Sequence, residues 1–419
     1  MRYKYLAAAL TMMIVVAGCS SAKNTASSSS STASNGATTA KKVTVGRFSF
    51  PSGAATGSTI KIGIVNSNNQ IPQVVTAAQA AVKYANANLD GINGHKIELV
   101  VCDEQANPAT ASTCTPKFVQ NQVAAVIGYP LVWLSIGGLT GLAAAHIPYL
   151  GIGTSGPAEN AADAYPMFGG DIQILNFVTQ FKAQHVKTVN YLSVNFPANV
   201  ASAEGIDKSV WGAAGITVKK EVFYTSGAAD VTTPAAQAIQ GNPDAIYVNN
   251  GPQDVVRAIA AIRQDGYKGK IFATYSALAP QLYPASASVM KGVTVETGQL
   301  LYFQDTANPE VALMHTILGS AGISSDSYAQ TGVAQVLTLA DMGDKIGGDP
   351  TGQSFLNYLK NVAGQDVFMG YQMNISQVPS NQPTLSHVTN VFSRFMSYDG
   401  KSFNYVSGWV SAFGTAGNG

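Results

Sequence analysis

Two neighbouring hydroxyl residues follow a short apolar run of this sequence, in a setting that suits ligand binding. Thr154 and Ser155 come directly after the run 147–152 and before Gly156 and Pro157. Two hydroxyl groups and the backbone N–H groups of such a turn suit a carboxylate or another group rich in hydrogen-bond acceptors. The same hydroxyl groups suit the N-cap of a helix, and the sequence leaves both interpretations open.

Two aromatic residues follow the preceding apolar run, 123–127. Tyr129 and Trp133 would lie at the carboxyl end of that strand. There the rings could stack on an apolar or aromatic ligand. The alternative is that they pack between two parts of the protein. We expect the ligand role.

Amide, hydroxyl and aromatic side chains recur around the ends of three later apolar runs, 188–194, 245–248 and 270–275. They are Phe196, Asn199, Asn249, Asn250, Gln253, Tyr275 and Ser276. Consecutive amides at a strand end act either as loop caps or as hydrogen-bonding groups for a ligand, and both roles remain open here.

Catalysis and metal binding have no support in the sequence. The five histidines are scattered and lack metal-ligand spacing. The motifs G-x-S-x-G, H-E-x-x-H, G-x-x-x-x-G-K-[ST] and C-x-x-C are absent. We expect a protein that is not an enzyme and that has no cofactor and no metal; an exported hydrolase without a motif is the alternative.

The composition limits the class of protein. The chain has 419 residues, of which 46% are hydrophobic and 11% charged, with a net charge of +1. A nucleic-acid-binding protein would carry a basic stripe, which this charge balance argues against. Single cores stop growing at about 250–300 residues, so the length predicts more than one lobe.

Strand and helix patterns alternate from residue 59 onward. Isoleucine-rich and valine-rich runs predict buried parallel strands, and apolar residues at spacings of three and four predict helices. The expected strands are 60–65, 97–102, 123–127 and 147–152, and the expected helices are 72–89, 108–122 and 131–145.

The alternation then starts again. The expected helices are 171–184, 199–214, 231–240 and 254–265, and the expected strands are 188–194, 216–224, 245–248, 270–275 and 293–302. Helices 327–346 and 351–362, a hairpin of 390–398 with 403–410, and a frayed tail, 413–419, complete the chain. This order predicts an α/β fold with two Rossmann-like lobes, each a parallel sheet flanked by helices, with the ligand outside the carboxyl ends of the strands.

The N-terminus resembles a bacterial lipoprotein signal. Arg2 and Lys4 precede an apolar run, 6–17, which is shorter than the ~20 residues of a membrane span. We expect a signal peptide, 1–18, cleaved before Cys19, whose lipid would anchor the chain to the membrane. An ordinary secretory signal is the alternative. The Ser-, Thr- and Ala-rich composition predicts a disordered tether over 19–58, although 43–51 is more apolar and could pack on the folded body.

Cys102 and Cys114 remain once Cys19 is assigned to lipidation. An even number of cysteines in an exported protein favours a disulfide. A metal site is the alternative, but histidine is absent from the neighbourhood of both cysteines.

Several segments together resemble the type I periplasmic solute-binding proteins of the leucine/isoleucine/valine-binding class, which serve ABC importers. The segments are 60–65, 88–99, 103–109, 126–128, 147–149 and 242–248. The resemblance implies a hinge between lobe 1 (59–170 and 298–389) and lobe 2 (171–297 and 390–412). It also implies an extracytoplasmic monomer that closes around a small-molecule ligand and docks on a membrane permease. A sensor subunit for a membrane receptor is the alternative.

The resemblance also implies where the solute would lie. Small and hydroxyl residues in the matching stretches, including Ser135 and Gly153 besides Thr154 and Ser155, would receive a ligand carboxylate. An acidic residue after the strand 270–275 would hold an ammonium group, but Ser276 starts a stretch without a carboxylate. We therefore expect a small polar solute, an amino acid or a related small carboxylate or amide, and favour one that is uncharged or bears a carboxylate.

Overall fold

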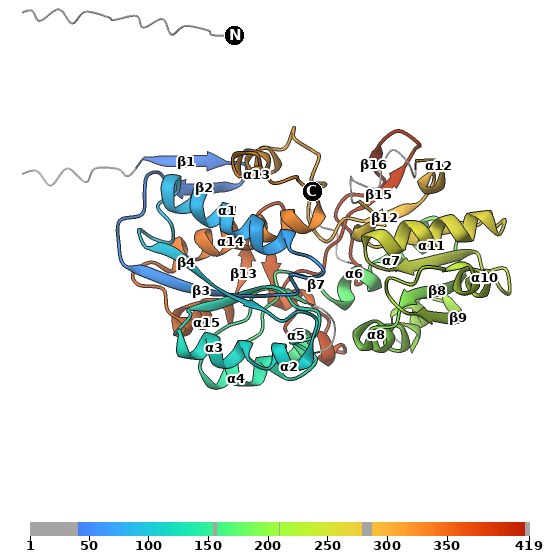
Figure 1. Ribbon diagram of the computed structural model, residues 1–419, viewed down its shortest axis with the longest axis horizontal. Helices are drawn as coiled ribbons and strands as arrows, with labels where there is room; N and C mark the ends of the chain where they lie inside the picture. The colour runs from blue at the N-terminus through green and yellow to red at the C-terminus, as the bar shows by residue number, and fades with distance from the viewer. Residues whose placement is uncertain (1–40, 154–156, 209, 279–286, 415–419) are drawn as a thin grey trace, which may run out of the picture. The chain divides into compact units, whose positions relative to one another are not determined.

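The computed structural model describes residues 41–153, 157–208, 210–278 and 287–414. The chain divides into two units, 1–39 and 40–419, and the second is described by itself (Figure 1). The predicted signal peptide, Cys19, Thr154, Ser155 and most of the predicted tail lie outside the described residues. None of the described helices has both the length and the apolar composition needed to cross a membrane.

The first lobe is built on a parallel sheet. In this sheet β3 (Thr59–Asn66) lies between β4 (Lys96–Asp103) and β5 (Ala125–Tyr129). Helix α1 (Gln73–Asn88) buries an apolar face that includes Val74 and packs against α14 (Ser327–Ile346). Gly332 allows that close approach, because a Cβ there would lie 2.3 Å from the Val74 carbonyl oxygen.

Several predicted elements of this lobe are shorter or divided. The predicted helix 108–122 is two helices, α2 (Pro108–Ala111) and α3 (Cys114–Gln120), and only α4 (Gly138–Ala144) forms within 131–145. The predicted strand 147–152 is reduced to a bridge between Tyr149 and Val126 and to β6 (Ile152–Gly153), which pairs with β7 (Phe168–Gly169). A short helix, α5 (Pro157–Asn160), lies between β6 and β7 in the chain.

The predicted disulfide is confirmed. Cys102, on β4, is bonded to Cys114, the first residue of α3, with their Cα atoms 5.5 Å apart. Both side chains are buried in the core of the first lobe.

The second lobe is built on a mixed sheet with the described order β16-β15-β12-β11-β10-β8-β9. Its parallel strands are β8 (Thr188–Val194), β9 (Thr217–Tyr224), β10 (Ala245–Asn249), β11 (Lys270–Ala273) and β12 (Thr294–Glu296). The predicted hairpin forms as the antiparallel pair β15 (Phe395–Tyr398) and β16 (Phe403–Tyr405). The helices are α6 (Asp171–Leu175), α7 (Phe177–Ala183), α8 (Pro197–Lys208), α9 (Val210–Ala213), α10 (Thr232–Ala238), α11 (Pro252–Gln264) and α12 (Ala287–Met290).

Further elements follow the second set of strands in the chain. They are α13 (Pro309–Ser320), which the sequence analysis did not predict, α15 (Gly352–Leu359), β13 (Ala363–Gln365) and β14 (Met373–Asn374). Gln299 forms hydrogen bonds to two segments that are distant in the sequence. Its Oε1 accepts a hydrogen bond from the backbone N–H of Gly169 at 2.5 Å, and its Nε2 donates to the carbonyl oxygens of Asn390 at 2.9 Å and Phe392 at 3.2 Å.

The predicted tether, 19–58, extends too far. Residues 42–51 form a hairpin of β1 (Lys42–Val45) and β2 (Phe48–Pro51), and Phe48 and Phe50 are buried in the core. The Phe48 ring packs 5.2 Å from that of Phe368, and the Arg47 guanidinium bonds Asp366 at 2.9 Å. The prediction failed because the alternation of Phe48 and Phe50 is short and is buried only by contacts distant in sequence.

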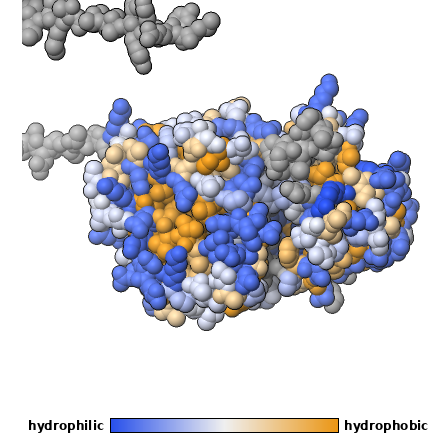
Figure 2. Space-filling view, viewed as in Figure 1, coloured by the Kyte–Doolittle hydropathy of each residue, from blue (hydrophilic) through white to orange (hydrophobic). Residues whose placement is uncertain are grey.

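At the C-terminus, Phe413 packs partly buried against the core of the second lobe, so the predicted fraying does not begin at this residue. The space-filling view shows hydrophobic residues gathered over the part of the first lobe that carries α1 and β4 (Figure 2).

Candidate functional site

A cavity of about 220 Å³ lies at the carboxyl ends of strands from both lobes. Tyr129 ends β5, Asn249 ends β10, and Tyr275 begins a 3₁₀ helix (Tyr275–Leu278) soon after β11. Open α/β sheets hold their ligands at this edge. Of the residues that the sequence analysis singled out, the structure brings eight together in its lining: Tyr129, Gly153, Phe196, Asn199, Asn249, Asn250, Tyr275 and Ser276.

Two of the remaining predicted residues lie elsewhere. Trp133 and Ser135 do not line this cavity, and Gln253 lies in the first turn of α11. Thr154 and Ser155 follow Gly153, outside the described residues. The described lining also contains residues that the sequence analysis did not single out for binding, including Gln70, Ile71, Leu131, Asp171, Gln173 and Tyr328.

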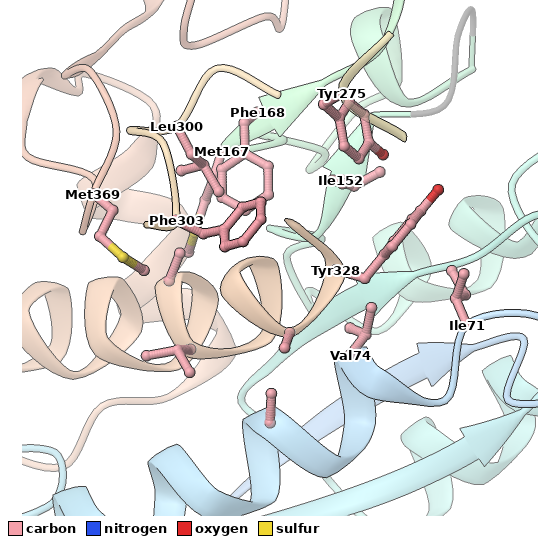
Figure 3. Packing of buried hydrophobic residues seen from close by; sticks show 14 of the residues in the cluster. Ile71, Val74, Ile152, Met167, Phe168, Tyr275, Leu300, Phe303, Tyr328 and Met369 are labelled. Carbon is pink, nitrogen blue, oxygen red and sulfur yellow. The ribbon is translucent and has the colours of Figure 1, made fainter. Parts of the chain in front are cut away.

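Three tyrosines form one wall of the cavity and connect the two sheets. The hydroxyl groups of Tyr129 and Tyr275 are hydrogen-bonded, and the ring of Tyr328 lies 5.7 Å from each of their rings. The hydroxyl groups of Tyr275 and Tyr328 point toward the same space (Figure 3). Burial raises the pKa of all three phenols, so the wall is neutral and offers ring faces and O–H groups.

Tyr328 is positioned by the start of α14. The Asp326 carboxylate accepts hydrogen bonds from the backbone N–H groups of Tyr328 at 2.9 Å and Ala329 at 2.7 Å. This N-cap fixes the first turn of the helix and therefore the direction of the Tyr328 ring.

Two buried amides in the lining lack hydrogen-bond partners. Asn250 is 5% exposed and has no partner for its Oδ1 or Nδ2, and Gln173 is 7% exposed and has none for its Nε2. The Tyr224 hydroxyl neighbours Asn250 but also lacks a hydrogen bond of normal geometry. An unpaired buried polar group costs about 1–3 kcal/mol. A solute that bonds to these groups would recover part of that cost.

The other amides and hydroxyls hold the loops in place. The Asn199 amide donates to Ser193 Oγ at 2.9 Å, and the Asn249 amide donates to the Tyr191 hydroxyl at 2.9 Å. Ser276 Oγ donates to the Asn250 carbonyl oxygen at 2.5 Å. These hydrogen bonds fix the backbone around Asn250, which is one of the residues that line the cavity.

Asp171 brings a carboxyl group to the cavity that the sequence analysis missed, because it interpreted Asp171 only as the first residue of the predicted helix 171–184. Ser202 Oγ donates to Asp171 Oδ1 at 2.6 Å, and the Asp171 N–H donates to Glu159 Oε1 at 2.7 Å. Burial raises the pKa of Asp171, while hydrogen bonds from the Ser202 and Glu159 side chains oppose that rise.

Within the described ranges, no group of three or more His, Cys, Asp or Glu side chains is placed to hold a metal ion. The described lining offers amide, hydroxyl and carboxyl groups and aromatic ring faces, which can bind an organic solute through hydrogen bonds and ring contacts.

Comparison with known proteins gives the family. A model described as periplasmic binding protein matches residues 60–383. This chain belongs to the periplasmic binding protein family. The match confirms the predicted type I fold and the resemblance on which that prediction partly depended. A search of curated protein sequences gave no match.

Solved structures of the same fold share little sequence with this member of the family. A fatty acid ABC transporter substrate-binding protein from Thermomonospora curvata has a TM-score of 0.69 and 18% identity, covering 88% of this chain and 96% of that one. The branched-chain amino acid transporter substrate-binding protein LivJ from Streptococcus pneumoniae, solved with isoleucine, has a TM-score of 0.66 and 18% identity. The match covers 83% of this chain and 99% of that one. A possible leucine/isoleucine/valine-binding protein from Rhodopirellula baltica has a TM-score of 0.68 and 13% identity. The match covers 84% of this chain and 97% of that one.

The prediction that Trp133 faces the cleft is wrong for this periplasmic binding protein. Its side chain is fully buried in the core of the first lobe, and its Nε1 donates to Thr115 Oγ1 at 3.0 Å. Glu104 holds this loop from inside: its carboxylate accepts the N–H groups of Leu131, Val132 at 3.0 Å and Trp133 at 2.6 Å. Ser135 is exposed, and its Oγ donates to the Val132 carbonyl oxygen at 2.7 Å.

Proposed function

We propose that this chain is the extracytoplasmic substrate-binding lipoprotein of an ABC importer. It captures a small polar solute by closure of two lobes and carries out no reaction on it. The observation that supports this best is a set of buried amide atoms without hydrogen-bond partners, Oδ1 and Nδ2 of Asn250 and Nε2 of Gln173, in residues that line a cavity at strand ends of both sheets. A solute that touches both lobes stabilises the closed state through its higher affinity for that state.

The size and chemistry of the cavity favour an amino acid or a small amide over a fatty acid. A volume of about 220 Å³ is small for a long acyl chain, since pockets for drug-sized ligands have about 300–1,000 Å³. The lining is mostly apolar, with Ile71, Leu131, Ile174, Val194 and Phe196 beside the three tyrosine rings, and amide, hydroxyl and carboxyl groups supply its polar part.

In this proposal the predicted lipid on Cys19 keeps the monomeric receptor beside its permease. Replacing Cys19 by Ala should leave the protein unprocessed or release it from the membrane, because the acylated residue is absent. Intact-mass measurement of the membrane fraction checks this. An unmodified mature N-terminus at another residue in the wild type would contradict the anchor.

Solute capture is tested by thermal-shift screening followed by isothermal titration with amino acids, their amides and octanoate. We expect amino acids or amides to raise the unfolding midpoint. The Asn250→Ala variant should lose about two- to tenfold in affinity, because a hydrogen bond is worth about 0.5–1.5 kcal/mol and the buried amide has no other partner.

The matched control is Asn357→Ala, which removes an exposed asparagine of α15. It should bind like the wild type. Binding that is unchanged in both variants would show that the solute does not reach Asn250, and chemical turnover of a bound solute would contradict the proposed function.

A further inference from the structure

Two loops of the first lobe that line the cavity are held by residues outside its lining. From the loop after β3 the described lining includes Gln70 and Ile71, and from the end of β5 and the loop after it Tyr129 and Leu131. Glu104 and the two disulfide-bonded cysteines do not belong to that lining. Their contacts nevertheless reach both loops.

The loop after β3 is bonded to the end of β4 and to the residue that follows it. Ser67 is fully buried and donates its hydroxyl to Glu104 Oε1 at 2.5 Å. The backbone N–H of Asn68 donates to Asp103 Oδ1 at 3.0 Å. These bonds fix the backbone shortly before Gln70, where the lining begins.

The same buried carboxylate holds the loop after β5. Glu104 is 0% exposed and accepts the N–H groups of three successive residues, Leu131, Val132 at 3.0 Å and Trp133 at 2.6 Å. Hydrogen bonds to an ionised group are stronger than those between neutral groups. A displacement of this one carboxylate would therefore loosen both loops.

The disulfide fixes the two groups that hold the loop after β5 relative to each other. Cys102 lies two residues before Glu104, and its partner Cys114 directly precedes Thr115. Thr115 Oγ1 accepts the indole N–H of Trp133 at 3.0 Å. The carboxylate and the hydroxyl that bind this loop thus each follow closely on one of the bonded cysteines.

The turn inside the disulfide loop has an unfavourable backbone. Gln105 and Ala106 both have positive φ, 54° and 50°, a conformation that costs energy in residues with a Cβ atom. Such a backbone persists only where its surroundings enforce it. Without the covalent bond across this turn, the neighbouring Glu104 would lose part of that enforcement.

We propose that the Cys102–Cys114 bond is a positioning element of the solute cavity, which acts through Glu104 and keeps the loops after β3 and β5 in the arrangement that binds solute. Its effect on affinity rests on the proposed solute-binding function. Its effect on the loops is measurable without solute, so the two proposals can fail separately.

The first test follows the loops by hydrogen exchange of the full chain, measured by mass spectrometry without solute. The variant Cys102→Ala with Cys114→Ala lacks the bond. Exchange in peptides 66–71 and 129–135 should become faster, because their N–H groups open locally more often. Peptide 188–194, which is β8 of the second lobe, should change less.

Two results of this test would overturn the proposal. One is faster exchange confined to 100–120, around the cysteines themselves, and the other is equal acceleration in β8. Cys102→Ala with Cys114→Val is a second form without the bond, which fills more of the space of the sulfur atoms. Failure of both forms to fold would also overturn it, because the bond would then serve the whole lobe and not the position of two loops.

The second test is isothermal titration with isoleucine, asparagine and tyrosine and with their amides. Without the bond, binding should be at least about threefold weaker, because solute must then order loops that are no longer held. The control for lost stability is Leu356→Ala, which removes a buried side chain of α15 outside the described lining. It should bind within about twofold of the wild type. An equal loss of affinity in this control would overturn the proposal.

Glu104→Gln shows whether the bond acts through Glu104. This substitution keeps the shape and removes the charge, so both loops should already be held less firmly. Removing the bond in this background should weaken binding less than it does in the wild type. Equal losses in both backgrounds, or a loss below about threefold in the wild type, would overturn the proposal. Absence of binding to the wild type would contradict the proposed function, and hydrogen exchange would still decide whether the bond positions the loops.

Discussion

The loop after β5 and the loop after β10 occupy equivalent places in their lobes, yet their polar groups are arranged in opposite ways. After β5, the N–H groups of Leu131, Val132 and Trp133 are all bonded to Glu104, and the Trp133 indole is bonded to Thr115. After β10, both polar atoms of the Asn250 side chain are buried without a partner. The first loop is internally satisfied, and the second leaves hydrogen-bonding capacity unused.

This difference shows what the position of a residue at a strand end does and does not imply. The position indicates that a residue lies near the ligand edge of the sheet. Whether its side chain is available to a solute depends on which partners the rest of the fold supplies. Glu104, which follows β4 in the chain, accepts hydrogen bonds from three backbone N–H groups of the loop after β5. The Asn250 side chain, by contrast, forms no hydrogen bond of normal geometry with any described residue.

The largest expected effect comes from removing the group that satisfies the first loop. Glu104→Ala should lower the free energy of unfolding by roughly 3–5 kcal/mol, because buried backbone N–H groups and the Ser67 hydroxyl, which donates to Glu104 at 2.5 Å, would lose a charged acceptor. Urea unfolding followed by fluorescence measures the change.

Glu98→Ala is the control, since Glu98 is an exposed glutamate on β4, the strand that precedes Glu104. Its expected change is below about 0.5–1 kcal/mol. Equal effects of the two substitutions would mean that Glu104 does not hold the loop.

The difference between what a local pattern indicates and what the rest of the fold supplies also explains which elements the sequence predicts correctly. β8 and α14 have the predicted bounds, 188–194 and 327–346, because burial extends over 189–194 of β8 and over 327–343 of α14. The predicted helix 108–122 divides because local groups compete with the helix: Ser112 Oγ donates to the Ala109 carbonyl oxygen at 2.7 Å, and Thr113 Oγ1 to that of Thr110 at 2.7 Å.

The sequence predicted which strand ends surround the cavity, but it predicted less well which individual residues line it. Tyr129, Asn250 and Tyr275 line the cavity as strand-end residues should. The burial of Trp133 depends on Thr115 and Tyr149, and the place of Asp171 depends on Glu159 and Ser202. These contacts join segments that are distant in the sequence, and a local sequence pattern does not indicate which distant segments come together. The role of each residue in binding remains a proposal.

The second prediction compares two buried asparagines of the second lobe, Asn190 on β8 and Asn250 directly after β10. Asn250→Leu should raise the free energy of unfolding by about 1 kcal/mol, because an unpaired amide is replaced by an apolar group of similar shape. Asn190→Leu should lower it by about 1–3 kcal/mol, because Asn190 Nδ2 donates to the carbonyl oxygens of Ala238 at 2.7 Å and Gln240 at 2.9 Å. Thermal and urea unfolding without solute give both values. Destabilisation by Asn250→Leu as large as that by Asn190→Leu would mean that Asn250 has a structural partner after all.

The smallest effect is expected at Ser135, which the sequence analysis placed in the site. The side chain is exposed and bonds only within its own loop, to the Val132 carbonyl oxygen at 2.7 Å. Ser135→Ala should therefore change the free energy of unfolding by less than about 0.5 kcal/mol, and the affinity for any bound amino acid or amide by less than about twofold. Isothermal titration beside Asn250→Ala makes the comparison direct. If Ser135→Ala lost affinity as Asn250→Ala is expected to, the loop after β5 would have to move into the cavity when solute binds, and its bonds to Glu104 would not keep it apart from the ligand.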